Sequence, residues 1–305
     1  MPTIQTISPV DGRVYVERET ATANEIEKVL SAAAAAQKTW KNTPVSERMA
    51  LCSKAVDAFV ARKAEIAEEI SWQMGRPISQ APGEVAGFEE RARHMISIAE
   101  SALADIKPEA KDGFTRYIKR VPVGVVFVVA PWNFPYLTSV NAIMPALLAG
   151  NSVVLKHSAQ TPLCAERLKQ AFDAAGMPEG VFQYMHLSHS DTEAVIRSPL
   201  VNFVAFTGSV PGGEMVERVA AGRFIGVGLE LGGKDPAYVR KDANLQQAIE
   251  TVTDGALFNS GQSCCGIERV YVDRSVYQEF VDGVVTLVKG YKLGRPDDGD
   301  TNIGP

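Results

Sequence analysis

From residue 123 to residue 289, short apolar segments alternate with longer segments that have the 3.6-residue spacing of helices. The predicted strands are 123–130, 152–155, 182–185, 201–206, 224–227, 237–239 and 270–272, and the predicted helices are 162–175, 191–196, 212–221, 245–258 and 275–289. A strand that returns to its sheet through a helix runs parallel to the strand before it. This alternation therefore predicts an α/β protein built on a doubly wound, mostly parallel sheet.

The first hundred residues are predicted to be helical. Thr22 and Glu25 fit a capping box, which starts a helix that runs to Trp40. A second helix is expected over 46–74, where Gly75 ends it, and a third over 83–103. A short strand at 117–119 is expected next, separated from the strand at 123–130 by a turn.

Charge and composition exclude several classes of protein. The net charge is -5 and no cluster of lysine and arginine stands out, so neither nucleic acid nor a membrane surface is expected as a partner. The first residues do not resemble a signal peptide and no apolar run is long enough to cross a membrane, so a cytoplasmic location is expected. The four cysteines lack metal-ligand spacing, so no metal site and reduced thiols are expected.

Cys264 is the candidate nucleophile. It lies in a glycine-containing loop, Asn259-Ser-Gly-Gln-Ser-Cys264-Cys265, directly after a predicted helix. A thiolate attacks carbonyl carbon readily when its pKa is lowered or a base stands nearby. The alternative is a small buried apolar residue, which is the commoner role of a free cysteine.

Glu230 and Asn133 are candidates for two further roles. Glu230 ends an apolar strand, where partial burial would suit a general base; the alternative is an ion pair with Lys234. Asn133 lies in the Pro-Trp-Asn-Phe-Pro segment at 131–135 and could donate an N–H to an oxyanion; the alternative is a rigid turn that caps a helix.

A glycine-rich turn at 206–213 joins a strand to a helix. Backbone N–H groups at a helix N-terminus favour phosphate. The spacing is not the usual dinucleotide fingerprint, so the turn alone is a weak signal.

Taken together and in this order, these segments resemble the aldehyde dehydrogenase family. The matching pieces are PWNFP at 131–135, VVLK at 153–156, QTP at 160–162, FTGS at 206–209, ELGGK at 230–234, and GQSC at 261–264 with Arg269. The resemblance covers essentially the whole chain. It implies a cofactor-binding domain at 1–112 and 124–232, an oligomerisation hairpin at 113–123, and the first part of a catalytic domain at 233–305. Family chains continue beyond residue 305, so the resemblance also implies that the second domain is incomplete.

The resemblance implies that an aldehyde is oxidised to a carboxylic acid with NAD or NADP. Cys264 would attack the aldehyde, Asn133 and the backbone N–H of Cys264 would stabilise the oxyanion, and Glu230 would activate water to hydrolyse the thioester. Two alternatives stay open. One is a related enzyme that passes the acyl group to coenzyme A, which would not need Glu230. The other is an inactive cofactor-binding fragment.

For the cofactor, the resemblance points to Trp132, Lys156, Gly208, Ser209, Gly213 and Gly232. Many relatives that prefer NAD have a glutamate three positions after the lysine, but this chain has Ala159 there. Without that carboxylate a 2′-phosphate is not repelled, so NADP is expected to be accepted, with help from His157 or Ser158.

For the substrate, the resemblance points to Phe134, Thr138 and Asn141. Relatives that act on succinate semialdehyde place an arginine where this chain has Asn141, so a substrate carboxylate would lack that partner and a neutral or aromatic aldehyde is expected. The full-length form is expected to be a homodimer or homotetramer, paired through the hairpin.

Overall fold

The computed structural model describes residues 2–305. Its strands are β1 (Thr3–Ile7), β2 (Val14–Glu19), β3 (Val125–Val129), β4 (Ser152–Lys156), β5 (Phe182–Tyr184), β6 (Val201–Thr207), β7 (Gly226–Glu230), β8 (Asp235–Val239) and β9 (Ile267–Val272). Its helices are α1 (Ala23–Trp40), α2 (Val45–Val60), α3 (Lys63–Met74), α4 (Pro82–Leu103), α5 (Pro135–Leu148), α6 (Leu163–Ala174), α7 (His189–Arg197), α8 (Val210–Ala220), α9 (Leu245–Leu257) and α10 (Tyr277–Lys289), with a short 3-10 segment η1 (Phe258–Gly261).

The central sheet has five parallel strands in the order β5-β4-β3-β6-β7. The predicted doubly wound parallel sheet is therefore confirmed. The chain starts in the middle at β3, moves outward through β4 and β5, and then returns to the other side of β3 for β6 and β7. The carboxyl ends of β3 and β6, where the direction changes, form the crevice in which such sheets bind ligands.

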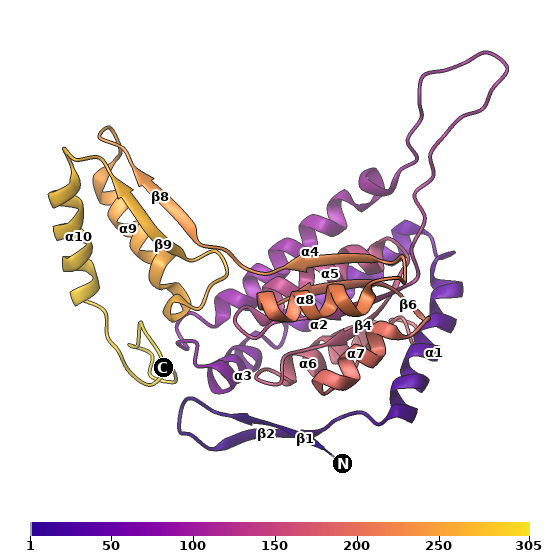
Figure 1. Ribbon diagram of the computed structural model, residues 1–305, viewed down its shortest axis with the longest axis horizontal. Coiled ribbons are helices and arrows are strands. Elements are labelled where there is room, and N and C mark those ends of the chain that lie inside the picture. Colours follow the sequence, from indigo (N-terminus) through magenta and orange to yellow (C-terminus); the bar gives the residue numbers. More distant parts are fainter. Residues whose placement is uncertain (1) are drawn as a thin grey trace.

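Helices cover both faces of this sheet because its strands are apolar on both faces (Figure 1). Val125, Phe127 and Val129 pack into a core with residues of α1, α7 and α8. Val126 and Val128 point the other way, into a larger core with residues of α2, α4, α5 and α6. Burial of apolar surface on both sides is the main force that holds these layers together.

A smaller α/β unit follows the central sheet and lies to its left in Figure 1. Its two strands, β8 and β9, are parallel, and α9 and α10 pack together beside them. Its core is small and contains Val239, Ile249 and Phe280.

The N-terminal segment differs from the prediction. β1 and β2 pair antiparallel as a hairpin, where helices alone were predicted for the first hundred residues. Both strands are short and mostly exposed, so they lack the apolar alternation that marks a half-buried strand.

The helix predicted at 46–74 is two helices, because Arg62 leaves the helical conformation between α2 and α3. Both helices pack against α4, and the apolar spacing continues across the break, so periodicity alone did not reveal it. The predicted ends are confirmed elsewhere: Thr22 and Glu25 form the capping box, and Gly75 ends α3 in the left-handed conformation at φ +83°.

Between α4 and β3 the chain forms a long protruding arm, which extends to the upper right in Figure 1. The expected strand at 117–119 is reduced to one isolated antiparallel bridge between Ile106 and Ile118. The arm therefore begins several residues before the hairpin predicted at 113–123. Phe114 near its tip is 64% exposed.

In the described part of the chain, no helix is both long and apolar enough to cross a bilayer. No group of three or more histidine, cysteine or acidic side chains in residues 2–305 is arranged to hold a metal ion.

Candidate active site

Two adjoining cavities meet at Cys264, at the carboxyl ends of β3, β6 and β7. The larger has a volume of ≈ 610 Å³ and the smaller ≈ 350 Å³. Glu230 and Cys264 line both. A thiol placed where two cavities join can face ligands in both at once.

Cys264 is exposed, whereas Cys52 and Cys164 are buried. Cys264 is therefore not the small buried apolar residue that was the alternative to a nucleophile. Its backbone is fixed, because its carbonyl accepts the N–H of Gly233 at 2.9 Å. Gly232 has φ +82° and lies against the same residue, since a Cβ added to it would be 3.7 Å from the Cβ of Cys264.

The pKa of the Cys264 thiol is raised above its usual value. Partial burial is the main cause, followed by the neighbouring Cys265, and the carboxylate of Glu230 also contributes. A thiol in this environment needs a base to take its proton. The other condition for a reactive thiol, a lowered pKa, is therefore not met.

Glu230 is exposed at the end of β7, not partly buried as the sequence suggested. Its backbone carbonyl accepts the N–H of Gly208 at 3.0 Å, which joins this strand end to the turn after β6. The proposed ion pair between Glu230 and Lys234 is wrong, because Lys234 pairs with Glu268 on β9 instead. The carboxylate of Glu230 thus faces the cavities without an ion-pair partner in residues 2–305.

Asn133 lies in the larger cavity with its side chain held at both ends. Its Oδ1 accepts the N–H of Phe134 at 3.0 Å, and its Nδ2 donates to the carbonyl of Gln262 at 3.1 Å. An amide nitrogen has two N–H donors, so one remains for an oxyanion. The bond to Gln262 also ties Asn133 to the loop that carries Cys264.

A buried ion pair supports this loop, and no sequence pattern indicated it. Arg76 and Glu84 bond at 2.6 Å, and each side chain is only 1% exposed. Arg76 also donates to the carbonyl of Asn133 at 2.8 Å and to Oδ1 of Asn259 at 2.9 Å. Both arginine and glutamate are typical of exposed helix surface, so no periodic pattern distinguishes this pair.

The larger cavity fits a dinucleotide. Ser209 caps α8, with its Oγ accepting the N–H of Gly212, so the positive end of that helix opens onto the cavity. Lys156 lies at its wall, and burial lowers the pKa of this amine. Trp132, Gly208 and Gly232 also line it, together with His189, which the sequence analysis missed.

Gly213 does not line this cavity. A Cβ there would meet the side chain of Leu231 at 2.6 Å, so this glycine allows α8 to pack closely against the chain after β7. Close packing of helix on strand is a usual role for a glycine in such turns.

His157 also lies apart from the cavity, contrary to the suggestion that it could help to hold a 2′-phosphate. It is buried and bonds through Nε2 to the carbonyl of Pro135. Burial lowers its pKa to about 4, so its ring is neutral near pH 7. Ser158, the other residue suggested, lines the cavity beside Lys156.

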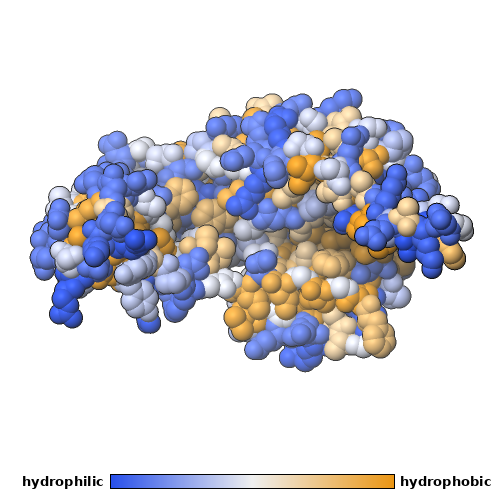
Figure 2. All heavy atoms as spheres, turned by 90° about the horizontal axis from the view of Figure 1, so that it is seen from above, coloured by the Kyte–Doolittle hydropathy of each residue, from blue (hydrophilic) through white to orange (hydrophobic). Residues whose placement is uncertain are grey.

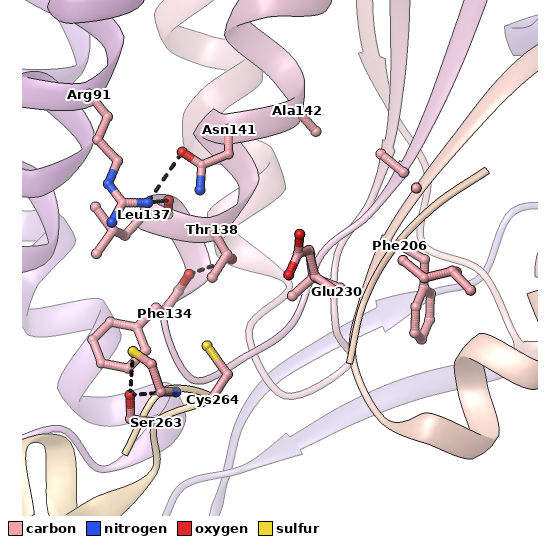
Figure 3. A pocket seen from close by; sticks show the side chains of 15 residues that line it. Arg91, Phe134, Leu137, Thr138, Asn141, Ala142, Phe206, Glu230, Ser263 and Cys264 are labelled. Atoms are coloured by element: carbon pink, nitrogen blue, oxygen red, sulfur yellow. Dashed lines mark hydrogen bonds between the residues drawn. The ribbon is translucent and has the colours of Figure 1, made fainter. Parts of the chain in front are cut away.

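The smaller cavity contains all three predicted substrate residues, Phe134, Thr138 and Asn141 (Figure 3). Arg91 enters it from α4 and was not identified from the sequence. From the sequence, an arginine was considered only at position 141, whereas Arg91 lies fifty residues earlier on an exposed helix face. The cavity therefore has a cation despite Asn141, and the expectation of a neutral substrate loses its basis.

The aldehyde dehydrogenase family model matches residues 2–305. The chain belongs to the aldehyde dehydrogenase family. Five of the matched motifs, at 131–135, 153–156, 206–209, 230–234 and 261–264, contribute residues to the two cavities, whereas QTP at 160–162 and Arg269 do not line them.

Curated relatives of this family member are about one third identical to it. Succinate-semialdehyde dehydrogenase [NADP(+)] 1 of Mycobacterium tuberculosis is 33% identical over 304 residues, which is 99% of this chain and 66% of the relative. The 2-hydroxymuconic semialdehyde dehydrogenase of Pseudomonas sp. is 35% identical over 311 residues, 99% of this chain and 64% of the relative. The chain thus spans about 65% of the length of these relatives.

Two solved structures of dehydrogenases have the same fold as this chain. A NAD-dependent benzaldehyde dehydrogenase from Corynebacterium glutamicum superposes with a TM-score of 0.93 at 32% identity, over 100% of this chain and 66% of that one. A 3,6-anhydro-L-galactose dehydrogenase in complex with NAP gives 0.92 at 31% identity, over 100% of this chain and 64% of that one.

Proposed function

We propose that the complete protein oxidises an aldehyde to a carboxylic acid with NAD or NADP. The observation that carries this proposal is the position of Cys264, exposed at the junction of the two cavities with the Glu230 carboxylate beside it. Family membership supports the same reaction class.

With the aldehyde in the smaller cavity, the sulfur of Cys264 attacks the aldehyde carbon and forms a C–S bond. The proton of the thiol passes to a base. Asn133 donates its remaining N–H to the oxyanion that develops, as does the backbone N–H of Cys264. The lining of the larger cavity would hold a nicotinamide dinucleotide, which would supply the acceptor for the hydride that leaves this carbon as the oxyanion collapses to a thioester. Glu230 then takes a proton from water, whose oxygen attacks the thioester, releases the carboxylic acid and frees the thiol.

A coenzyme A-acylating reaction and an inactive cofactor-binding chain are the alternatives. Glu230 opposes the first, because transfer to coenzyme A does not require a base for water. The test is NAD(P)H formation with a panel of aldehydes, with and without coenzyme A. Turnover that requires coenzyme A would contradict the proposal, and cofactor binding without any turnover would favour the inactive chain.

For the cofactor, we propose that NADP is accepted. Lys156 supplies positive charge at the cavity wall, Ser158 supplies a hydroxyl donor, and Ala159 supplies no carboxylate to repel a 2′-phosphate. A curated relative is named as an NADP(+) enzyme. The ratio of kcat/KM for NADP and NAD tests this point, and a large preference for NAD would contradict it.

A further inference from the structure

Arg91 gives the smaller cavity a positive charge at the end away from Cys264. In Figure 3 its side chain descends from α4 toward Asn141, while Cys264 lies at the other end, beyond Phe134 and Thr138. A small molecule that fills this cavity can therefore meet the thiol at one end and the guanidinium at the other.

No carboxylate neutralises this guanidinium within residues 2–305. Arg91 bonds only to neutral oxygens: the side-chain Oδ1 of Asn141 at 3.2 Å and the backbone carbonyl of Leu137 at 3.5 Å. Arg93, two residues further along the same helix, has two ion pairs, with Asp57 at 2.7 Å and with Glu89 at 2.8 Å. Neutral acceptors orient the Arg91 side chain and leave its full charge available to a ligand.

The surroundings of Arg91 suit an anion with two oxygens. Both bonds of Arg91 come from one nitrogen, Nη1, so its other N–H groups have no partner in residues 2–305. The Nδ2 of Asn141 also has none there, and this amide is held in place through its oxygen. Guanidinium and carboxylate match geometrically through two parallel hydrogen bonds.

We infer that the substrate is an aldehyde that carries a carboxylate at its far end, and that Arg91 binds that carboxylate. The inference rests on the proposed function. Without such a cation, an anionic substrate would be repelled by Glu230, which lines the same cavity. Arg91 thus determines specificity and does not take part in the chemistry at Cys264.

The test uses the intact protein and a series of ω-oxo carboxylates of three to six carbons, each paired with its methyl ester. The ester keeps the aldehyde and the chain length but removes the charge. We expect kcat/KM to be about 10- to 100-fold higher for at least one acid than for its ester. Arg91→Met should remove most of this preference through KM, with a much smaller effect on the ester, and Arg91→Lys should restore part of it.

Arg93→Met is the matched control, because it removes an arginine from the same helix outside the cavity; it should leave the acid-to-ester ratio unchanged. An ester used as well as every acid, or an equal loss for acid and ester in Arg91→Met, would overturn the inference. Either result still supports aldehyde oxidation. If no aldehyde is oxidised, the proposed function is wrong. The role of Arg91 is then tested by alkylation: protection of Cys264 from iodoacetamide by the acid but not by its ester supports carboxylate binding, and equal protection contradicts it.

Discussion

Cys264 and Cys265 are chemically identical neighbours in the sequence, but the structure gives them different positions. Cys264 reaches both cavities, whereas Cys265 lines only the smaller one and its Sγ lies 3.4 Å from the hydroxyl of Ser263. A thiol must reach both the substrate carbon and the cofactor cavity for hydride transfer to follow attack. Only Cys264 meets that requirement.

Cys264→Ser should lower the rate of NAD(P)H formation by on the order of 10³-fold or more, because a hydroxyl is a far weaker nucleophile at neutral pH. Cys265→Ser should keep most of the activity and serves as the matched control. Steady-state kinetics on both variants measures this difference. If Cys265→Ser lost activity and Cys264→Ser did not, the assignment of the nucleophile to Cys264 would be wrong.

The raised pKa of Cys264 predicts how its reactivity depends on pH. The raised pKa favours the protonated thiol, so the thiolate of Cys264 forms at higher pH than that of an ordinary cysteine. The rate of alkylation of Cys264 should therefore still increase with pH in the range where the rate for a free thiol is already constant. Glu230→Gln removes a negative charge that contributes to the raised pKa, so its alkylation midpoint should move to lower pH.

Alkylation with iodoacetamide across a pH series, without cofactor, measures both midpoints in a variant that also carries Cys265→Ser. Glu268→Gln, which changes a glutamate outside the cavities, should leave the midpoint in place. A midpoint below that of a free thiol would contradict the prediction.

At the scale of elements, the site depends on how a few loops are held against one another. Arg76 follows α3 and Glu84 lies in the first turn of α4, and together they hold the segment between β3 and α5. Glu84 accepts the N–H groups of Tyr136 and Leu137, both at 2.9 Å, at the start of α5. This pair therefore fixes where Asn133 lies relative to the Cys264 loop.

Glu84→Gln should destabilise the protein by about 3–5 kcal/mol, because it leaves the charge of Arg76 buried without a counter-ion. We also expect a fall in kcat, since the Asn133 loop loses its support, with less effect on cofactor affinity. Thermal unfolding and steady-state kinetics measure these effects. Glu89→Gln, which breaks a more exposed pair with Arg93 on the same helix, should cost no more than about 1 kcal/mol. Equal effects of the two substitutions would contradict the role of the buried pair.

At the scale of the whole molecule, the protruding arm and its exposed apolar side chains stand out. Figure 2 shows apolar residues gathered over one part of the surface rather than scattered among charged ones. Phe114, Tyr117, Ile118 and Val121 are exposed along the arm. Exposed apolar residues on an extended arm favour contact with another chain.

We expect the intact protein to be a homodimer or homotetramer that uses this arm. Phe114→Asp together with Tyr117→Asp should shift it toward monomers, because charge is then placed where apolar side chains would be buried. Light scattering coupled to size exclusion measures the mass. Val14→Asp, an exposed apolar position in the separate β1–β2 hairpin, is the control. An unchanged mass in the arm variant would exclude the arm from the interface.

Local physical rules were sufficient to predict several elements of the fold from the sequence. Apolar segments alternating with helical spacing predicted the parallel sheet, the capping box predicted the start of α1, and Gly75 marked the end of α3, because each rule acts over a few neighbouring residues. Local rules left the roles of Cys264 and Glu230 open, and the resemblance of their contiguous segments to family motifs made them candidates.

Contacts between distant segments depended on the tertiary structure alone. The bonds of Arg76 to Asn133 and Asn259, the bond of His157 to Pro135 and the entry of Arg91 into the smaller cavity each follow from how distant segments pack together. A charged residue looks the same in a sequence whether it faces solvent, a buried partner or a cavity. Packing in the folded protein removes water from some of these positions, and the charge there then interacts more strongly with a buried partner or a ligand.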